Sequence, residues 1–123
     1  SFPVAFDAAS QDVARAEFEE DIRQAILIIL ETTPGERVMR PDFGSGLRAM
    51  VFEPVNYTTL ALVKQRVEQA LVFWEPRIDV REVTVTPNGS APNRIDIDIG
   101  YQVRATNTFY NLVYPFYLQE GRE

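Results

Sequence analysis

The chain has 123 residues, 46% of them hydrophobic, which predicts a single packed domain spanning residues 1–123. Its net charge of −6 argues against a general surface for binding nucleic acid or anionic lipid. The sequence contains no run of about 18 apolar residues, so it predicts no membrane-spanning helix. The absence of histidine and cysteine excludes a Ser–His–Asp triad, a Cys–His pair and any metal site built on either residue.

The first third of the chain predicts a short strand and then a helix. Phe2, Val4 and Phe6 alternate with other residues, as in a strand. A wide apolar stripe predicts a helix from about Ala16 to Thr32 that is covered on more than one side, and Pro34-Gly35 would end it. The stripe consists of Phe18, Ile22, Ala25, Ile26, Ile29 and Leu30, widened by Leu27 and Ile28.

The middle of the chain predicts a loop and a second helix. Residues 36–54 contain several glycines and prolines and are typical of a loop with short strand pieces. A second apolar stripe predicts a helix from about Thr58 to Trp74, with the stripe in the core. Its members are Leu60, Val63, Val67, Ala70, Leu71 and Trp74.

A proline flanked by opposite charges follows this helix, as Glu75-Pro76-Arg77. Pro76 has no N–H and disfavours helical geometry at Glu75, so the helix should stop here. The helix dipole disfavours a carboxylate at this end, and Arg77 is the compensating charge. Two interpretations remain open: a proline stop between two solvated charges, or a functional corner where a local rule is broken.

Alternating patterns after the corner predict two strands. The phase of the first pattern changes at Arg81-Glu82, so we expect a β-bulge there. Asn88-Gly89 predicts the turn that follows. The next strand alternates cleanly and has one solvated face. The apolar residues are Ile78, Val80, Val83 and Val85 in the first strand, and Ile95, Ile97, Ile99, Tyr101 and Val103, alternating with Asp96, Asp98 and Gln102, in the second.

The final segment, Phe109 to Leu118, is apolar on both faces. Such a strand is either buried on both faces within the chain or paired with a segment from outside it. Pro115 would remove one donor from the sheet ladder and favours an edge position. An edge strand can accept an extended segment as an added strand.

The order of these elements is strand, helix, irregular loop, helix and three strands. It predicts an α+β fold in which two helices pack on a small, mostly antiparallel sheet with a C-terminal edge strand. The sequence contains no repeat, low-complexity segment or linker between domains.

Four segments carry a resemblance to a known family: residues 30–47, 51–54, 75–77 and 110–118. In this order and spacing they resemble the small baseplate wedge family of contractile phage tails and related injection machines. That family is often labelled "lysozyme-like" and is better described as the sheath initiator. The resemblance extends from about Phe2 to Leu118.

The resemblance implies a structural component that joins the large baseplate wedge proteins to the sheath subunit, in six copies per baseplate. It also implies assembly in the bacterial cytoplasm. Glu75, Pro76 and Arg77 would dock on the wedge proteins, with the loop from Pro34 to Leu47 as support. The strand that would accept the extended arms of the first sheath ring consists of Asn111, Leu112, Val113, Tyr114, Pro115, Phe116, Tyr117 and Leu118.

The "lysozyme-like" label raises the alternative of a glycoside hydrolase, which needs two carboxyl groups with one of them protonated. The neighbouring Arg37 and Arg77 would instead favour ionised carboxylates. The Asp-x-Asp pair lacks the glycine-bearing acidic loop of a calcium site. We therefore expect no catalytic residues, cofactor or metal site. A further alternative is a peptide-binding adaptor that acts by strand addition. The candidate carboxylates are Glu36, Glu53, Glu75, Asp96 and Asp98.

Overall fold

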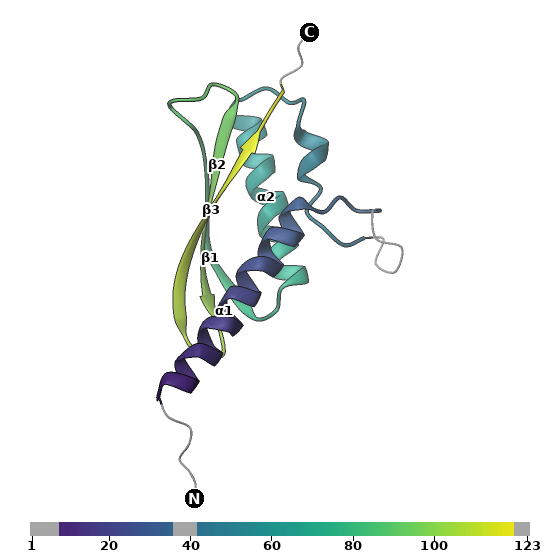
Figure 1. Cartoon of the computed structure of the whole chain (residues 1–123). Coiled ribbons are helices and arrows are strands. Elements are labelled where there is room, and N and C mark those ends of the chain that lie inside the picture. The colour runs from purple at the N-terminus through teal and green to yellow at the C-terminus, as the bar shows by residue number, and fades with distance from the viewer. Residues whose placement is uncertain (1–7, 36–41, 120–123) are drawn as a thin grey trace, which may run out of the picture.

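The computed structural model describes residues 8–35 and 42–119. The strand expected at Phe2, Val4 and Phe6 lies outside this range. Two helices lie on one face of a three-stranded antiparallel sheet with strand order β1-β2-β3 (Figure 1). The elements are α1 (Ala8–Glu31), a 3-10 turn η1 (Leu47–Met50), α2 (Tyr57–Trp74), β1 (Ile78–Pro87), β2 (Arg94–Val103) and β3 (Thr108–Tyr117). The predicted α+β fold with a C-terminal edge strand is confirmed.

Helix α1 begins at Ala8, eight residues before the expected start at Ala16. The side chains of residues 8–17 are exposed, so no apolar stripe marks this part of the helix. Four alanines favour helix here by propensity alone. The prediction was wrong because it relied on burial, which begins only at Phe18. The buried residues of α1 are Ile22, Ile26, Ile29 and Leu30.

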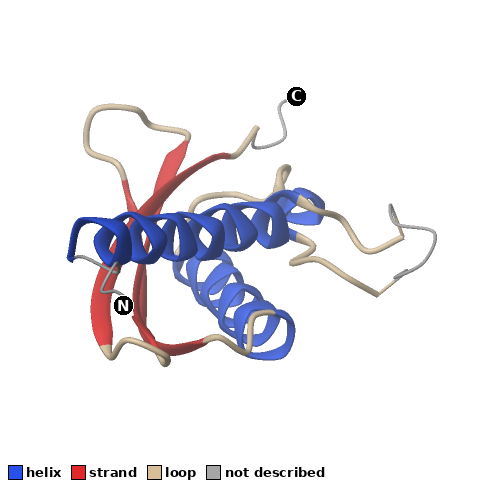
Figure 2. Cartoon of the chain, turned by 60° about the horizontal axis from the view of Figure 1, so that its bottom comes forward, coloured by secondary structure: helices blue, strands red, loops and turns tan. Residues whose placement is uncertain are grey.

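Helix α2 matches its prediction to within one residue. The Asn56 side chain accepts a hydrogen bond from the Thr59 N–H at 2.9 Å and caps the first turn. The expected stripe faces the core, with Val63, Val67 and Leu71 fully buried. The two helices cross on their side of the sheet (Figure 2), which leaves the other face of the sheet open.

The sheet has one buried and one solvated face. In β2 the odd-numbered side chains from Ile95 to Val103 are buried, and the even-numbered ones are half-exposed. The register between β1 and β2 shifts between Val80 and Glu82, which confirms the predicted bulge. No helix among the described residues is long and apolar enough to cross a bilayer.

Candidate docking surfaces

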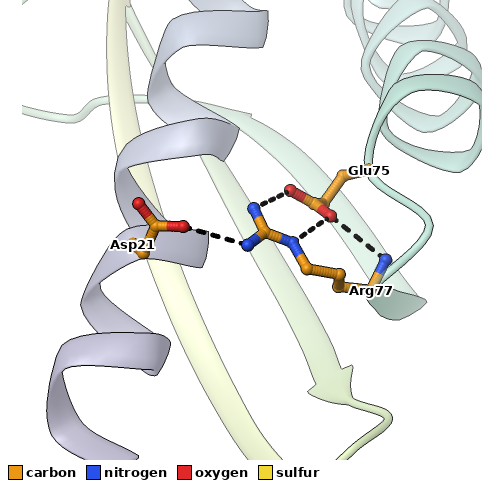
Figure 3. Close-up of polar contacts among 3 residues, drawn as sticks. All are labelled: Asp21, Glu75 and Arg77. Atoms are coloured by element: carbon orange, nitrogen blue, oxygen red, sulfur yellow. Dashed lines mark hydrogen bonds and ion pairs between the residues drawn. The ribbon is translucent and has the colours of Figure 1, made fainter. Parts of the chain in front are cut away.

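The first candidate surface is the corner between α2 and β1, formed by Glu75, Pro76 and Arg77. Glu75 is only 3% exposed and caps the C-terminus of α2. Its Oε1 accepts from the Arg77 Nε at 2.8 Å and from the Arg77 backbone N–H at 3.1 Å, and its Oε2 accepts from Nη2 at 2.8 Å (Figure 3). The interpretation of two solvated charges is therefore wrong for Glu75.

Arg77 also ties the corner to α1. Its Nη1 donates to the Asp21 Oδ2 at 3.0 Å, and its guanidinium lies 5.9 Å from the centroid of the Phe18 ring. The hydrogen bond to Glu75 is the main reason that the pKa of Arg77 is raised, and Asp21 adds to it. The planar fork thus joins two elements of its own chain, while 37% of the Arg77 side chain stays exposed.

A groove of about 440 Å³, here called the corner groove, opens beside these residues. Ile28 forms part of one wall and is 44% exposed, so the expectation that α1 would be covered there is wrong. Phe43 and Trp74 meet edge to face at 5.0 Å between ring centroids. These three residues come from α1, the following loop and α2, and no pattern in the sequence predicts that they meet. The groove is lined by Ala25, Ile28, Ile29, Phe43, Trp74, Glu75, Pro76 and Arg77.

The loop after α1 holds Phe43 in this groove. Gly44 has φ +123°, and a Cβ there would lie 2.3 Å from the Thr32 carbonyl oxygen. The Ser45 N–H donates to the carbonyls of Ile29 and Thr32, and its hydroxyl donates to that of Leu30. Residues 42–47 of the expected supporting loop thus pack against α1, whereas Glu36 and Arg37 lie outside the described residues.

The second candidate surface is β3, which stands at the edge of the sheet. Phe109, Val113 and Tyr117 are 61%, 50% and 52% exposed on the solvated face, and Leu112 is buried on the other. The interpretation in which both faces are buried within the chain is therefore wrong.

The free edge of β3 carries a defined set of backbone groups. The Leu118 N–H donates to the Asn93 carbonyl at 2.8 Å, and the β2–β3 register runs without a shift. Because pairs in an antiparallel ladder alternate, the even-numbered residues bond β2 and the odd-numbered ones direct N–H and C=O groups to the free edge. Pro115 therefore lacks a donor at this edge, and the expectation that it removes a ladder bond is wrong.

The solvated face of the sheet holds two of the remaining candidate carboxylates, Asp96 and Asp98, and Glu53 lies between η1 and α2. Asp96 accepts from Asn88 at 2.9 Å and from Arg94 at 2.7 Å, and these two bonds lower its pKa. Asp98 accepts from the Asn111 side chain on β3, and Glu53 is exposed. Over residues 8–35 and 42–119, no group of three or more acidic side chains is arranged to hold a metal ion.

A family model described as baseplate wedge protein gp25 matches residues 16–108 of the chain. The chain belongs to this family. The resemblance seen in the sequence is thereby confirmed. The match includes the corner and α2 and ends at Thr108, the first residue of β3.

Two curated relatives carry baseplate names. The chain is 35% identical to the baseplate wedge protein gp25 of Enterobacteria phage T4 over 78 residues, which are 63% of this chain and 59% of that protein. It is 40% identical to baseplate protein W of Escherichia phage P2 over 65 residues, which are 53% of this chain and 56% of that protein. The matched region thus spans less than two thirds of either relative.

Solved structures show the same likeness, and one of them matches nearly the whole chain, β3 included. A Geobacter sulfurreducens protein described as a tail lysozyme is 49% identical, with a TM-score of 0.76 over 98% of this chain and 100% of that one. A chain of the anti-feeding prophage baseplate is 28% identical, with a TM-score of 0.65, and the match covers 68% of this chain and 67% of that one. A chain of the post-contracted pyocin R2 baseplate is 28% identical, with a TM-score of 0.54, and the match covers 80% of this chain and 83% of that one.

Proposed function

We propose that this chain is a non-enzymatic baseplate component that joins the large wedge proteins to the sheath subunit and templates sheath assembly. Membership of the baseplate wedge family over residues 16–108 carries this proposal. Six copies would act together in each baseplate after assembly in the bacterial cytoplasm. The sixfold symmetry of the anti-feeding prophage baseplate, which contains a similar chain, supports that number.

The free edge of β3 would serve the sheath. The odd-numbered residues offer backbone donors and acceptors to an extended segment, which can bind as a fourth strand. Val113 and Tyr117 add exposed apolar area beside these groups. The strand from Asn111 to Leu118 would therefore fix the position and direction of the first sheath arm.

The corner would hold the chain on the wedge proteins. Glu75 and Arg77 satisfy each other, so their contribution to docking is to fix the exposed Pro76 beside the corner groove. A partner that places apolar side chains in this groove would bury Ile28 and gain the usual hydrophobic stabilisation of about 25 cal/mol per Å². The exposed part of the Arg77 guanidinium would add polar contacts at the rim.

A hydrolytic role has little support from the side chains. A glycosidase needs one protonated and one ionised carboxyl group across a substrate cleft. Glu75 is engaged by Arg77, and the pKa of Asp96 is lowered by Asn88 and Arg94. The baseplate names of the curated relatives agree with a structural role.

The proposal is tested by binding to the sheath subunit. Deleting the chain after Thr108 is unsuitable because it removes the buried Leu112 and Leu118. Val113→Pro instead removes one donor at the free edge and leaves the β2 ladder intact, so sheath binding should weaken about tenfold or more. Val113→Thr keeps the N–H and is the matched control. Equal sheath binding by both variants would contradict the sheath role.

The wedge role is tested in the same way on α1. Ile28→Asp places a charge in the corner groove, whereas Val13→Asp changes an exposed apolar residue of the same helix away from the groove. We expect Ile28→Asp to abolish incorporation into baseplates while sheath binding is retained, and Val13→Asp to behave as wild type. Normal incorporation of Ile28→Asp would contradict docking at the corner.

A further inference from the structure

A second groove, here called the strand groove, lies next to the C-terminal half of β3. It has a volume of about 460 Å³ and lies between the end of α1, η1 and β3. Phe52 is 68% exposed at this groove, and Tyr114 and Phe116 are only half-buried, although they point to the helix-covered side of the sheet. The groove is lined by Leu30, Glu31, Leu47, Arg48, Val51, Phe52, Tyr114, Phe116 and Gln119.

The strand groove lies directly beside the edge strand β3, which supplies two of its lining residues. The Gln119 N–H donates to the Val51 carbonyl at 2.6 Å, which fixes the segment after η1 beside the end of β3. The core side chains of β2 are fully covered, but the same face of β3 is left partly open at Tyr114 and Phe116. The two partly exposed side chains therefore lie on the same strand whose outer backbone groups have no partner strand among the described residues.

A strand added to this edge would reach the groove through its side chains. Side chains of a strand alternate between the two faces of the sheet, and directly opposed residues of neighbouring strands point to the same face. The residues opposite Tyr114 and Phe116 would therefore point to the helix-covered face, into the strand groove. The intervening residues would lie beside Val113 and Tyr117 on the solvated face.

We infer that the strand groove is a side-chain site for the added strand, and that this strand is apolar on both of its faces. The inference rests on the proposed function. Val51, Phe52 and Phe116 supply apolar walls for the inward side chains. The rim carries one acid and one base, Glu31 and Arg48, so it favours neither charge sign. The groove thus selects apolar residues at two alternate positions of the partner.

The test measures affinity for the sheath subunit of the same particle, with three variants. Phe52→Asp makes one groove wall polar. Phe73→Asp is its matched control, because Phe73 is 69% exposed on α2 and away from the strand groove. Val51→Trp fills the groove with a larger side chain and leaves the sequence of β3 unchanged. We expect about tenfold weaker binding for Phe52→Asp and Val51→Trp, and less than about twofold change for Phe73→Asp.

The outcomes separate this inference from the proposed function. If Phe52→Asp and Val51→Trp bind as wild type while Val113→Pro does not, strand addition stands and the groove inference is overturned. If the unaltered chain fails to bind the sheath subunit, both are overturned. Circular dichroism of each variant identifies any loss of folding, and Phe52→Asp is the safer variant because its side chain is mostly exposed.

Discussion

The corner at Glu75–Arg77 and the free edge of β3 use their polar groups in opposite ways. At the corner, both oxygens of a buried carboxylate accept from one arginine, which also reaches across to α1. At the β3 edge, the odd-numbered backbone groups have no partner strand among the described residues. The corner is complete before any partner binds, whereas the edge is left ready to accept one.

Because of this difference, we expect the corner to affect the stability of the isolated chain and the β3 edge to affect partner binding. A buried group that loses its partner costs free energy in the isolated chain. An unpaired group at a solvated edge is hydrated and costs little until a partner arrives. Changes at the corner should therefore appear first in unfolding, and changes at the edge should appear first in complex formation.

The largest effect is expected at Gly44, which places Phe43 in the corner groove. In Gly44→Ala the new Cβ would lie 2.3 Å from the Thr32 carbonyl oxygen, and φ is +123°. We expect a loss of about 3 kcal/mol or more in unfolding free energy, measured by urea titration. Gly35→Ala is the control, since it has φ +100° but no atom within 4 Å. An equal loss in both variants would mean that the close approach to α1 has no influence.

Arg77→Ala should have the next largest effect, because it leaves Glu75 buried without its main partner. A buried pair that loses one member costs about 3–5 kcal/mol, and the partial exposure of Arg77 reduces this to about 2–3 kcal/mol. Arg104→Ala breaks an exposed pair with Asp79 and should cost less than about 1 kcal/mol. If Arg77→Ala unfolds at the same urea concentration as wild type, the pairing of Arg77 with Glu75 does not stabilise the fold.

The smallest effect concerns the inward side of β3. A hydrogen bond with Glu19 on α1 raises the pKa of Tyr110 from 10.0 to about 12. The folded chain keeps this proton longer than the unfolded chain, so the contribution is fully present below pH 10 and is lost as the pH rises to about 12. Tyr110→Phe should lose less stability over this interval than wild type, as measured by urea unfolding at both ends of it.

The sequence predicted the elements wherever burial leaves a periodic pattern. The stripe of α2, the alternation of β2 and the bulge near Arg81 all follow from apolar spacing. The start of α1 could not be found this way, because residues 8–17 form an exposed helix. Propensity of the alanines was the available signal, and it is weaker than periodicity.

The candidate surfaces were only partly predictable. The Glu75-Pro76-Arg77 motif was visible, but its partner Asp21 lies 56 residues away and depends on how α1 crosses the sheet. The two grooves depend on contacts between distant segments, such as that of Phe43 with Trp74. The assignment of odd-numbered groups to the free edge required the β2–β3 register.

Amide hydrogen exchange of β3, followed residue by residue by NMR with and without the sheath subunit, tests the central claim most directly. In the free chain the even-numbered amides should exchange slowly and the odd-numbered ones fast, since only the former bond β2. Binding of the sheath subunit should slow the odd-numbered amides of Phe109, Asn111, Val113 and Tyr117. A sheath complex in which these four amides still exchange fast would contradict strand addition at this edge.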